Sequence, residues 1–231
     1  RKLVQKVPFH FRGQSFVTRG ELPTNEKFIG NAKMFGYGEK QKLLKEPQYA
    51  TRPQELTKKY YDKVSDMDEV TRMQYLDINM WMVGDILLKA DRMSMANSLE
   101  LRVPFLDKEV FEVASTLPTR LRVNKKNTKY AMREAAMRHL PQATAQKEKL
   151  GFPVPTRVWL RDEKYYQIVK DAFTSEIAEK FFNTEELVKI LDTHYHNRQD
   201  YSRRIWTLFI FIVWYQIYFE DGGHEPGNFP D

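Results

Sequence analysis

Cysteine is absent from all 231 residues of the chain. Without a thiol, the protein can form neither disulfides nor thiolate metal sites, and this composition favours a reducing compartment, so we expect the cytoplasm. The opening stretch RKLVQKVPFHFRGQSF also lacks the apolar core and the small-residue cleavage site of a signal peptide. These absences argue against a disulfide-stapled secreted protein.

Several catalytic motifs are absent as well. The sequence contains no G-x-S-x-G, no H-E-x-x-H and no glycine-rich phosphate loop. His194 and His196 stand two apart in a predicted helix, where side chains at positions i and i+2 diverge. We therefore expect surface histidines, and we expect the chain to hold no metal ion of its own.

Long uncharged apolar runs are lacking too. The segment IWTLFIFIVWYQIYF has 15 residues, whereas a membrane-spanning helix needs roughly 20. A helix that is apolar all round normally lies inside a domain, so we predict a buried C-terminal helix and no membrane contact. The net charge is +6, but the basic and aromatic stretch RKLVQKVPFHFRG carries no nucleic-acid signature. We expect a solvated basic face and no nucleic-acid partner.

Helical periodicity dominates what the sequence does contain. Residues 1–65 are basic and rich in turn signals, which indicates a wrapping segment with short helices. Residues 66–220 repeat apolar residues at helical spacing, and residues 221–231 form a turn-rich, flexible tail. No segment alternates apolar and polar residues long enough for a convincing strand, so the predicted fold class is all α.

Capping signals predict where individual helices begin and end. Asp66 and Glu69 form a capping box ahead of two helices that we expect to be broken near Gly84. Pro104 ends the second of these helices, and Asp107 can cap the next one, KEVFEVASTL.

The run DRMSMANSLELRVPFLD, residues 91–107, sets four ionisable side chains among apolar ones. Asp91 and Arg92 belong to the end of a helix, and Glu100 and Arg102 to an extended lead-in to a proline. Buried charges are costly unless they are paired, so we expect these four residues to form an ion-pair network that locks the helix to the loop. We expect them to be mostly buried and paired with charged or backbone groups of this chain or of a missing partner domain. The residues alone leave open whether such a network is catalytic or architectural.

Two lysines stand in AQKEKLGFPVP, just before a glycine and two prolines that indicate a rigid loop. A lysine on such a loop is a positioned point charge suited to phosphate oxygens. Lys147 and Lys149 are therefore candidates for phosphate binding, with ordinary surface lysines as the alternative.

Three stretches carry a family resemblance: DILLKADRMSMANSLELRVPFLDKEVFEVASTLP, TKYAMREAAMRHLP and KEKLGFPVPTRVWL. Together they resemble the C-terminal part of the synthetase domain of glutamine-hydrolysing asparagine synthetases. The resemblance is weak before Asp66 and strong from Asp85 to Trp159, and it includes the closing RRIWTLFIFIVWYQIYFED. It implies that this all-α chain is the helical portion of an α/β PP-loop synthetase domain, a relative of the adenine-nucleotide α-hydrolases.

The resemblance also implies a reaction. The side-chain carboxylate of aspartate attacks ATP, with Mg²⁺, to give β-aspartyl-AMP and pyrophosphate. Ammonia released from glutamine by a separate N-terminal amidotransferase domain then displaces AMP. Aspartate, ATP and ammonia are thus the implied partners, and the oligomeric state is open, with a homodimer among the options.

The resemblance assigns roles residue by residue. Lys149 matches the lysine of the family's R-x-K-x-G-F loop, which implies that it neutralises pyrophosphate and the adenylate. Lys147 stands where many relatives have arginine, which implies a secondary phosphate contact. Four residues of the signature run are implied to shape the floor of the pocket for aspartate and the intermediate: Asp91, Arg92, Glu100 and Arg102.

The departures from the family pattern are equally specific. The S-G-G-x-D-S pyrophosphate loop, the S-G-E-G-x-D-E segment and the N-terminal nucleophilic cysteine are absent from these residues. We therefore expect a C-terminal fragment that lacks the adenylate-binding sheet and the glutaminase, binds no cofactor tightly and is inactive alone. Two alternatives are a β-lactam-type synthetase, which would carry an acidic residue where Arg92 stands, and a helical interaction module without chemistry.

Overall fold

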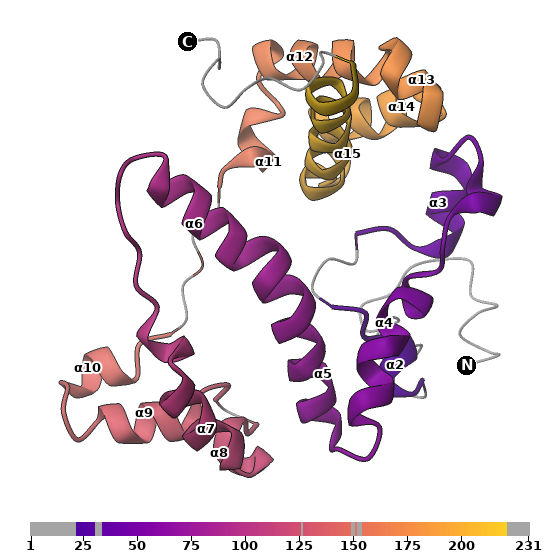
Figure 1. Cartoon of the computed structure of the whole chain (residues 1–231). Helices are drawn as coiled ribbons and strands as arrows, with labels where there is room; N and C mark the ends of the chain where they lie inside the picture. The colour runs from indigo at the N-terminus through magenta and orange to yellow at the C-terminus, as the bar shows by residue number, and fades with distance from the viewer. Residues whose placement is uncertain (1–21, 31–33, 126, 149–150, 152–153, 221–231) are drawn as a thin grey trace. The chain divides into compact units, whose positions relative to one another are not determined.

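The computed structural model describes residues 22–30, 34–125, 127–148, 151 and 154–220. Over these residues the chain is built of helices without a β-strand, and one isolated antiparallel bridge joins Leu44 to Phe182 (Figure 1). The predicted all-α class is therefore confirmed for the described part of the chain. Both predicted end segments, residues 1–21 of the wrapping segment and residues 221–231 of the tail, lie outside the described residues.

The chain divides into two compact units, which are described separately. Unit 1 comprises residues 1–32 and 51–150, and unit 2 comprises residues 33–50 and 151–231. The short helices predicted before residue 66 thus contribute to both units. Unit 1 contains α2 (Thr24–Lys27), α4 (Pro53–Tyr61), α5 (Glu69–Asp77), the π-helix η4 (Ile78–Leu87), α6 (Leu88–Met95), α7 (Lys108–Thr116), α8 (Thr119–Arg122), α9 (Tyr130–Ala136) and α10 (Gln142–Ala145). Unit 2 contains α3 (Tyr37–Leu43), α11 (Thr156–Trp159), α12 (Glu163–Phe173), α13 (Glu176–Phe181), α14 (Thr184–Tyr195), α15 (Ser202–Tyr215) and the π-helix η6 (Gln216–Glu220). Short 3₁₀ turns complete the set: η2 (Pro47–Tyr49), η3 (Asp62–Val64) and η5 (Pro104–Leu106).

The longest feature of unit 1 is the uninterrupted helical rod α5–η4–α6 (Figure 1). The predicted break near Gly84 is wrong, because the backbone passes through this glycine in a π-helical segment instead of leaving the helix. A single glycine inside a helix costs only about 1 kcal/mol relative to alanine, which neighbouring turns offset. The rod ends at Met95, well before Pro104, and Ser98 follows with φ 55°.

Aspartates cap two of the unit 1 helices. At the start of the rod the cap is Asp68 and not the predicted Asp66, since Asp68 Oδ1 accepts from the amides of Val70 at 3.0 Å and Thr71 at 3.2 Å. Asp107 caps α7 as predicted, accepting from the Glu109 amide at 2.9 Å. Each cap satisfies amides that a helix leaves unpaired at its first turn.

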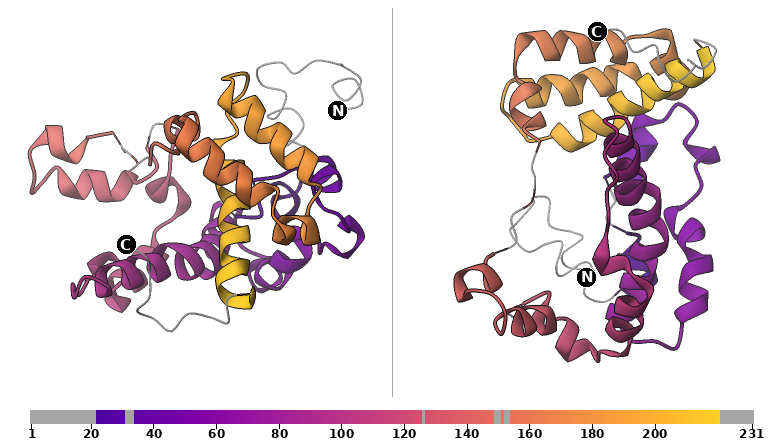
Figure 2. Two further views of the ribbon diagram at one scale, coloured as in Figure 1. Left: turned by 90° about the horizontal axis from the view of Figure 1, so that it is seen from above. Right: turned by 60° about the vertical axis from the view of Figure 1, so that its left-hand side comes forward.

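Unit 2 is held by a core of fully buried side chains from four helices: Phe173, Ala178, Leu187, Leu191 and Ile205. Three of these helices, α12, α14 and α15, lie side by side (Figure 2, right). The prediction that α15 is buried holds for one face only. Ile205 and Ile212 lie in the core, whereas Trp206 and Trp214 are 43% and 44% exposed. No helix in the described part of the chain is long and apolar enough to cross a membrane.

Candidate functional site

The four charged residues of the signature run lie on the surface of unit 1. Asp91 and Arg92 are exposed on α6, and Glu100 and Arg102 are exposed on the extended segment between α6 and η5. Glu100 Oε1 and Arg102 Nη2 form an ion pair at 2.7 Å with side chains 70% and 81% exposed. Within the described residues neither Asp91 nor Arg92 joins this pair, so the chain by itself does not form the predicted ion-pair network between helix and loop, while pairing with a further domain stays a prediction.

The physical reason lies in the chain path. The helix ends at Met95 and the chain turns at Ser98, so the two halves of the run leave in different directions. Glu100 and Arg102 stand two residues apart on extended backbone. Their side chains therefore point to the same side of the strand-like segment, as side chains at i and i+2 do. Because all four side chains reach solvent, there is no desolvation penalty to offset, and the Glu100–Arg102 pair is worth at most about 1 kcal/mol.

The apolar residues around this run are exposed as well. Leu99 is 61% exposed, Phe105 67% and Phe111 47%. We call the exposed apolar side chains of this stretch the apolar face: Leu99, Leu101, Val103, Phe105, Leu106, Val110, Phe111 and Val113. A large group of exposed apolar side chains on a protein surface usually marks an interaction site.

The structure describes one of the two candidate lysines. Lys147 is exposed two residues after the end of α10, and its backbone amide donates to the Thr144 carbonyl at 3.3 Å. Lys149 lies outside the described residues. The lysine segment, which we define as residues 146–155, therefore starts from a helical turn that presents Lys147 to solvent.

The ion-pair network of unit 1 lies elsewhere, between α8 and α5. Arg122 Nη1 donates to Gln74 Oε1 at 2.7 Å, while its Nη2 lies 2.8 Å from Thr71 Oγ1 and 3.3 Å from Asp68 Oδ2. A hydrogen bond from the Thr71 hydroxyl, helped by Thr119, lowers the pKa of Asp68 to about 2. Sequence reasoning missed this network, since its partners are distant in the chain and its only local signal was the aspartate cap.

The expectation of two surface histidines is half wrong. His196 is exposed, but His194 is fully buried on α14. Its Nδ1 accepts from the Tyr201 amide at 3.1 Å, and its Nε2 lies 3.1 Å from the Arg157 carbonyl. Burial lowers the pKa of His194 below its usual value, because the charged imidazolium would lose its hydration.

The described residues contain no preformed cluster of metal ligands. Among them no cluster of three or more His, Asp or Glu side chains could hold a metal ion. A phosphate-cradling glycine loop is absent from the sequence as well. What the chain offers to a phosphorylated ligand is cationic charge.

A family model gives the class of this chain, because its domain belongs to the PP-loop superfamily. The family model described as asparagine synthase matches residues 8–216, and the chain belongs to this family. The resemblance drawn from the sequence motifs is thereby confirmed.

The relatives found are themselves asparagine synthetases by name. The chain is 42% identical over 214 residues to asparagine synthetase [glutamine-hydrolyzing] 1 of Bacillus subtilis, covering 93% of this chain and 34% of that protein. It is 39% identical over 219 residues to a putative asparagine synthetase of Mycobacterium tuberculosis, covering 95% of this chain and 34% of that protein. The rat enzyme is 33% identical over 137 residues, covering 52% of this chain and 24% of that protein. The chain thus spans about a third of the length of the bacterial relatives (34%). No solved structure matches it.

Proposed function

We propose that this chain supplies the helical part of an ATP-dependent asparagine synthetase that converts aspartate to asparagine with ammonia taken from glutamine. The observation that carries the proposal is the match to the asparagine synthase family over residues 8–216, with 42% identity to the Bacillus subtilis enzyme. The aspartate carboxylate attacks ATP to form β-aspartyl-AMP and release pyrophosphate, and ammonia then displaces AMP. Mg²⁺ accompanies the ATP and screens its phosphates.

The lysine segment is the proposed source of positive charge for this reaction. Lys149 neutralises the pyrophosphate and the adenylate, and Lys147 makes a secondary contact with the phosphates. The exposed position of Lys147 at the end of a helical turn supports this role, because its ammonium group is free to reach a ligand. Phosphoryl chemistry is accelerated chiefly by placing such charges where negative charge develops.

The signature run is the proposed floor of the pocket for aspartate and β-aspartyl-AMP. Asp91, Arg92, Glu100 and Arg102 are all exposed in the chain by itself, which leaves their charges available to a substrate that carries an ammonium group and a carboxylate. The pair formed by Glu100 and Arg102 presents both signs of charge within 2.7 Å.

The apolar face is the proposed contact with the nucleotide-binding part of the synthetase. The chain covers 34% of the length of its Bacillus subtilis relative, and no glycine-rich phosphate loop occurs in it. A synthetase therefore needs further residues to hold ATP, and an exposed set of Leu, Val and Phe side chains is a suitable surface for them. The 231-residue chain by itself is inactive in this proposal, and the enzyme works in the cytoplasm with a glutaminase domain.

The test compares two activities of the full-length synthetase on one preparation. Lys149→Ala should reduce pyrophosphate release on the order of 10²–10³-fold, by analogy with removal of one oxyanion donor, while glutamine hydrolysis survives. Lys189→Ala is the matched control, because Lys189 is an exposed lysine of α14 whose side chain is 71% accessible. Unchanged pyrophosphate release in Lys149→Ala would move the role to Lys147 or off this segment, and loss of both activities would indicate misfolding.

A further inference from the structure

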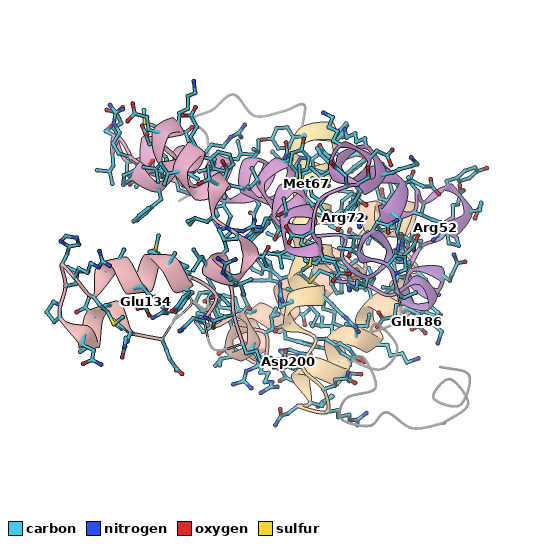
Figure 3. All side chains as sticks on the ribbon, turned by 90° about the horizontal axis from the view of Figure 1, so that it is seen from below. Arg52, Met67, Arg72, Glu134, Glu186 and Asp200 are labelled. Carbon is cyan, nitrogen blue, oxygen red and sulfur yellow. The ribbon has the colours of Figure 1, made fainter. Side chains whose placement is uncertain are left out.

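Three helices of unit 2 line a cavity that contains none of the residues proposed for catalysis. α3, α14 and α15 contribute to its walls, and its volume is about 250 Å³, close to the lower end of ordinary ligand pockets, about 300 Å³. Every lining residue is described, and all of them belong to unit 2. Glu186 of α14, labelled in Figure 3, is one of them. The charged lining residues are two carboxylates and three cations: Glu39, Glu186, Lys42, Lys189 and Arg204.

Arg204 of α15 is held in place by three neighbours. Its Nη1 pairs with Glu39 Oε1 at 2.6 Å. Its guanidinium carbon lies 5.1 Å from the centre of the Tyr201 ring and 5.9 Å from the centre of the Phe35 ring. The side chain is only 28% exposed. A guanidinium packed against aromatic rings loses little side-chain freedom when a ligand binds, so Arg204 is a preorganised cation.

Glu39 is fixed as well, and it leaves most donors of Arg204 unused. Its Oε2 accepts from the Gly36 amide at 2.7 Å, while Oε1 pairs with the arginine. A guanidinium has five N–H donors, and within the described residues the contact with Glu39 is the one polar contact of the Arg204 side chain. Arg204 therefore keeps donors for a ligand in the cavity.

The other charges of the lining favour an anion. Glu186 Oε1 lies 3.2 Å from Lys189 Nζ, so this carboxylate has its own cation on the same helix. Lys42 of α3 is exposed and forms no ion pair within the described residues. Three cations against two carboxylates leave an excess of one positive charge around the cavity. A ligand with a negative charge is the one that this excess attracts.

The remaining lining suits an apolar group. Leu43 is 5% exposed, and Phe35 and Ile190 pack partly buried against the same core. A phosphate ion has no apolar part to place there, whereas a small carboxylate with a hydrocarbon body uses both kinds of lining. The planar fork of an arginine also matches the two oxygens of a carboxylate.

We propose that the cavity between α3, α14 and α15 binds a small organic carboxylate with an apolar body. The carboxylate group pairs with Arg204 and Lys42, and the body packs on Phe35 and Ile190. None of these residues belongs to the lysine segment or to the signature run, and the proposal does not rest on the proposed function.

Butyrate is the probe, because it joins a carboxylate to a short hydrocarbon chain. In ¹H–¹⁵N NMR spectra of the 231-residue chain, it should shift the amides of Thr193 and Arg204, which line the cavity, and the shifts should saturate. Butylamine has the same body with the opposite charge, and inorganic phosphate is an anion without a body, so neither should reproduce these shifts. The absence of saturable shifts up to about 50 mM butyrate, or equal binding of phosphate and butyrate, overturns the proposal.

Substitutions then assign the carboxylate contacts. Arg204→Gln should raise the dissociation constant for butyrate at least about tenfold, because a charge-assisted hydrogen bond is lost. Lys42→Gln should raise it about threefold, since this lysine is exposed to solvent. The matched control is Lys164→Gln, at an exposed lysine of α12 that does not line the cavity, and it should leave binding unchanged.

The two variants also guard against a folding artefact. Arg204 pairs with α3 through Glu39, so amide shifts remote from the cavity must first show that Arg204→Gln is folded. Should it not fold, Lys42→Gln decides the matter, because Lys42 has no ion pair to lose within the described residues. Butyrate affinity that is the same in the wild type and in the folded variants contradicts the proposal.

Discussion

Arg122 Nη2 lies 3.3 Å from Asp68 Oδ2, although 54 positions separate the two residues in the sequence. The same nitrogen also lies 2.8 Å from the Thr71 hydroxyl and 2.9 Å from the Thr119 hydroxyl, so α8 is bound to the first turn of α5. Asp68 thereby has two roles, as the helix cap of the rod and as the anion of this network. The arginine that neutralises Asp68 is thus Arg122, which lies outside the signature run.

This double role predicts a larger effect at Asp68 than at an ordinary cap. Asp68→Ala should lower the free energy of unfolding by more than the ~1 kcal/mol typical of a lost N-cap, because Arg122 loses its carboxylate as well. Asp107→Ala is the matched control, since Asp107 caps α7 by the same geometry and forms no ion pair with an arginine in the described residues. Urea unfolding of both variants checks the difference, and equal losses would contradict it.

His194 predicts a pH dependence of stability with a definite sign. Burial lowers the pKa of His194 in the native protein. A backbone hydrogen bond at Arg157 raises this pKa and the charge of Arg161 lowers it, while Asp200, whose Oδ1 lies 3.6 Å from Nδ1, and a backbone hydrogen bond at Gln199 raise it. Below the usual histidine pKa of about 6.5, His194 is protonated in the unfolded chain but stays neutral in the native chain until a lower pH. Stability should therefore fall as the pH drops below about 6.5, with a limiting slope of about 1.4 kcal/mol per pH unit for one proton.

His194→Gln has no titrating group at this position and should lose this part of the slope. The comparison of wild type and variant, by urea unfolding between about pH 7 and about pH 5, isolates the contribution of this residue from those of the other titrating groups. Parallel curves for the two proteins would show that His194 does not titrate with unfolding in this range.

Local signals predicted part of the fold well, and the errors arose from tertiary contacts. Asp107 was identified correctly because a cap is decided within one helical turn. In the run D-M-D-E the predicted cap was Asp66, whereas the bonds to the Val70 and Thr71 amides show that the cap is Asp68, two residues later. Periodicity could not predict the π-helical passage through Gly84, because a π-turn shifts the register without a change in composition.

Burial was harder to predict than helicity. The apolar neighbours of Asp91 and Arg92 predict burial in this chain or against a missing domain, yet in the chain by itself Met93 and Met95 are exposed. His194 was placed on the surface from its spacing to His196, but the packing of α14 against α12 and α15 buries it. Which side of an amphipathic helix is buried depends on the helices that pack against it, and these can be distant in the sequence. The family motifs, by contrast, are local strings, and they led directly to the correct family.

A substitution on the apolar face should have a small effect on the stability of the 231-residue chain and a large effect on that of the full-length synthetase. Phe105 is 67% exposed, so Phe105→Ser in the 231-residue chain should change the free energy of unfolding by no more than about 0.5 kcal/mol. In the full-length synthetase the same substitution should lower thermal stability and pyrophosphate release, because a buried phenylalanine is worth several kcal/mol, about 3–5 on truncation. Differential scanning calorimetry of both proteins measures this contrast.

Tyr49→Ser is the control for that experiment. Tyr49 is 77% exposed and lies outside the apolar face, so its loss should matter in neither protein. A Phe105→Ser synthetase as stable and active as the wild type would show that no other part of the enzyme packs on this face.

The last prediction concerns Lys149→Arg in the full-length synthetase, where lysine and arginine differ in the geometry of their donors. Arginine keeps the positive charge, but its planar guanidinium presents donors in a fixed fork, whereas the lysine ammonium is a compact charge with three rotatable donors. Pyrophosphate release by Lys149→Arg should therefore lie between those of Lys149→Ala and the wild type, while glutamine hydrolysis stays at the wild-type rate. Lys147→Arg is the matched substitution on the same segment, and it should be nearly neutral, since the resemblance places arginine there in many relatives. Full wild-type activity in Lys149→Arg would mean that charge alone, and not the geometry of the ammonium group, is what the reaction requires at this position.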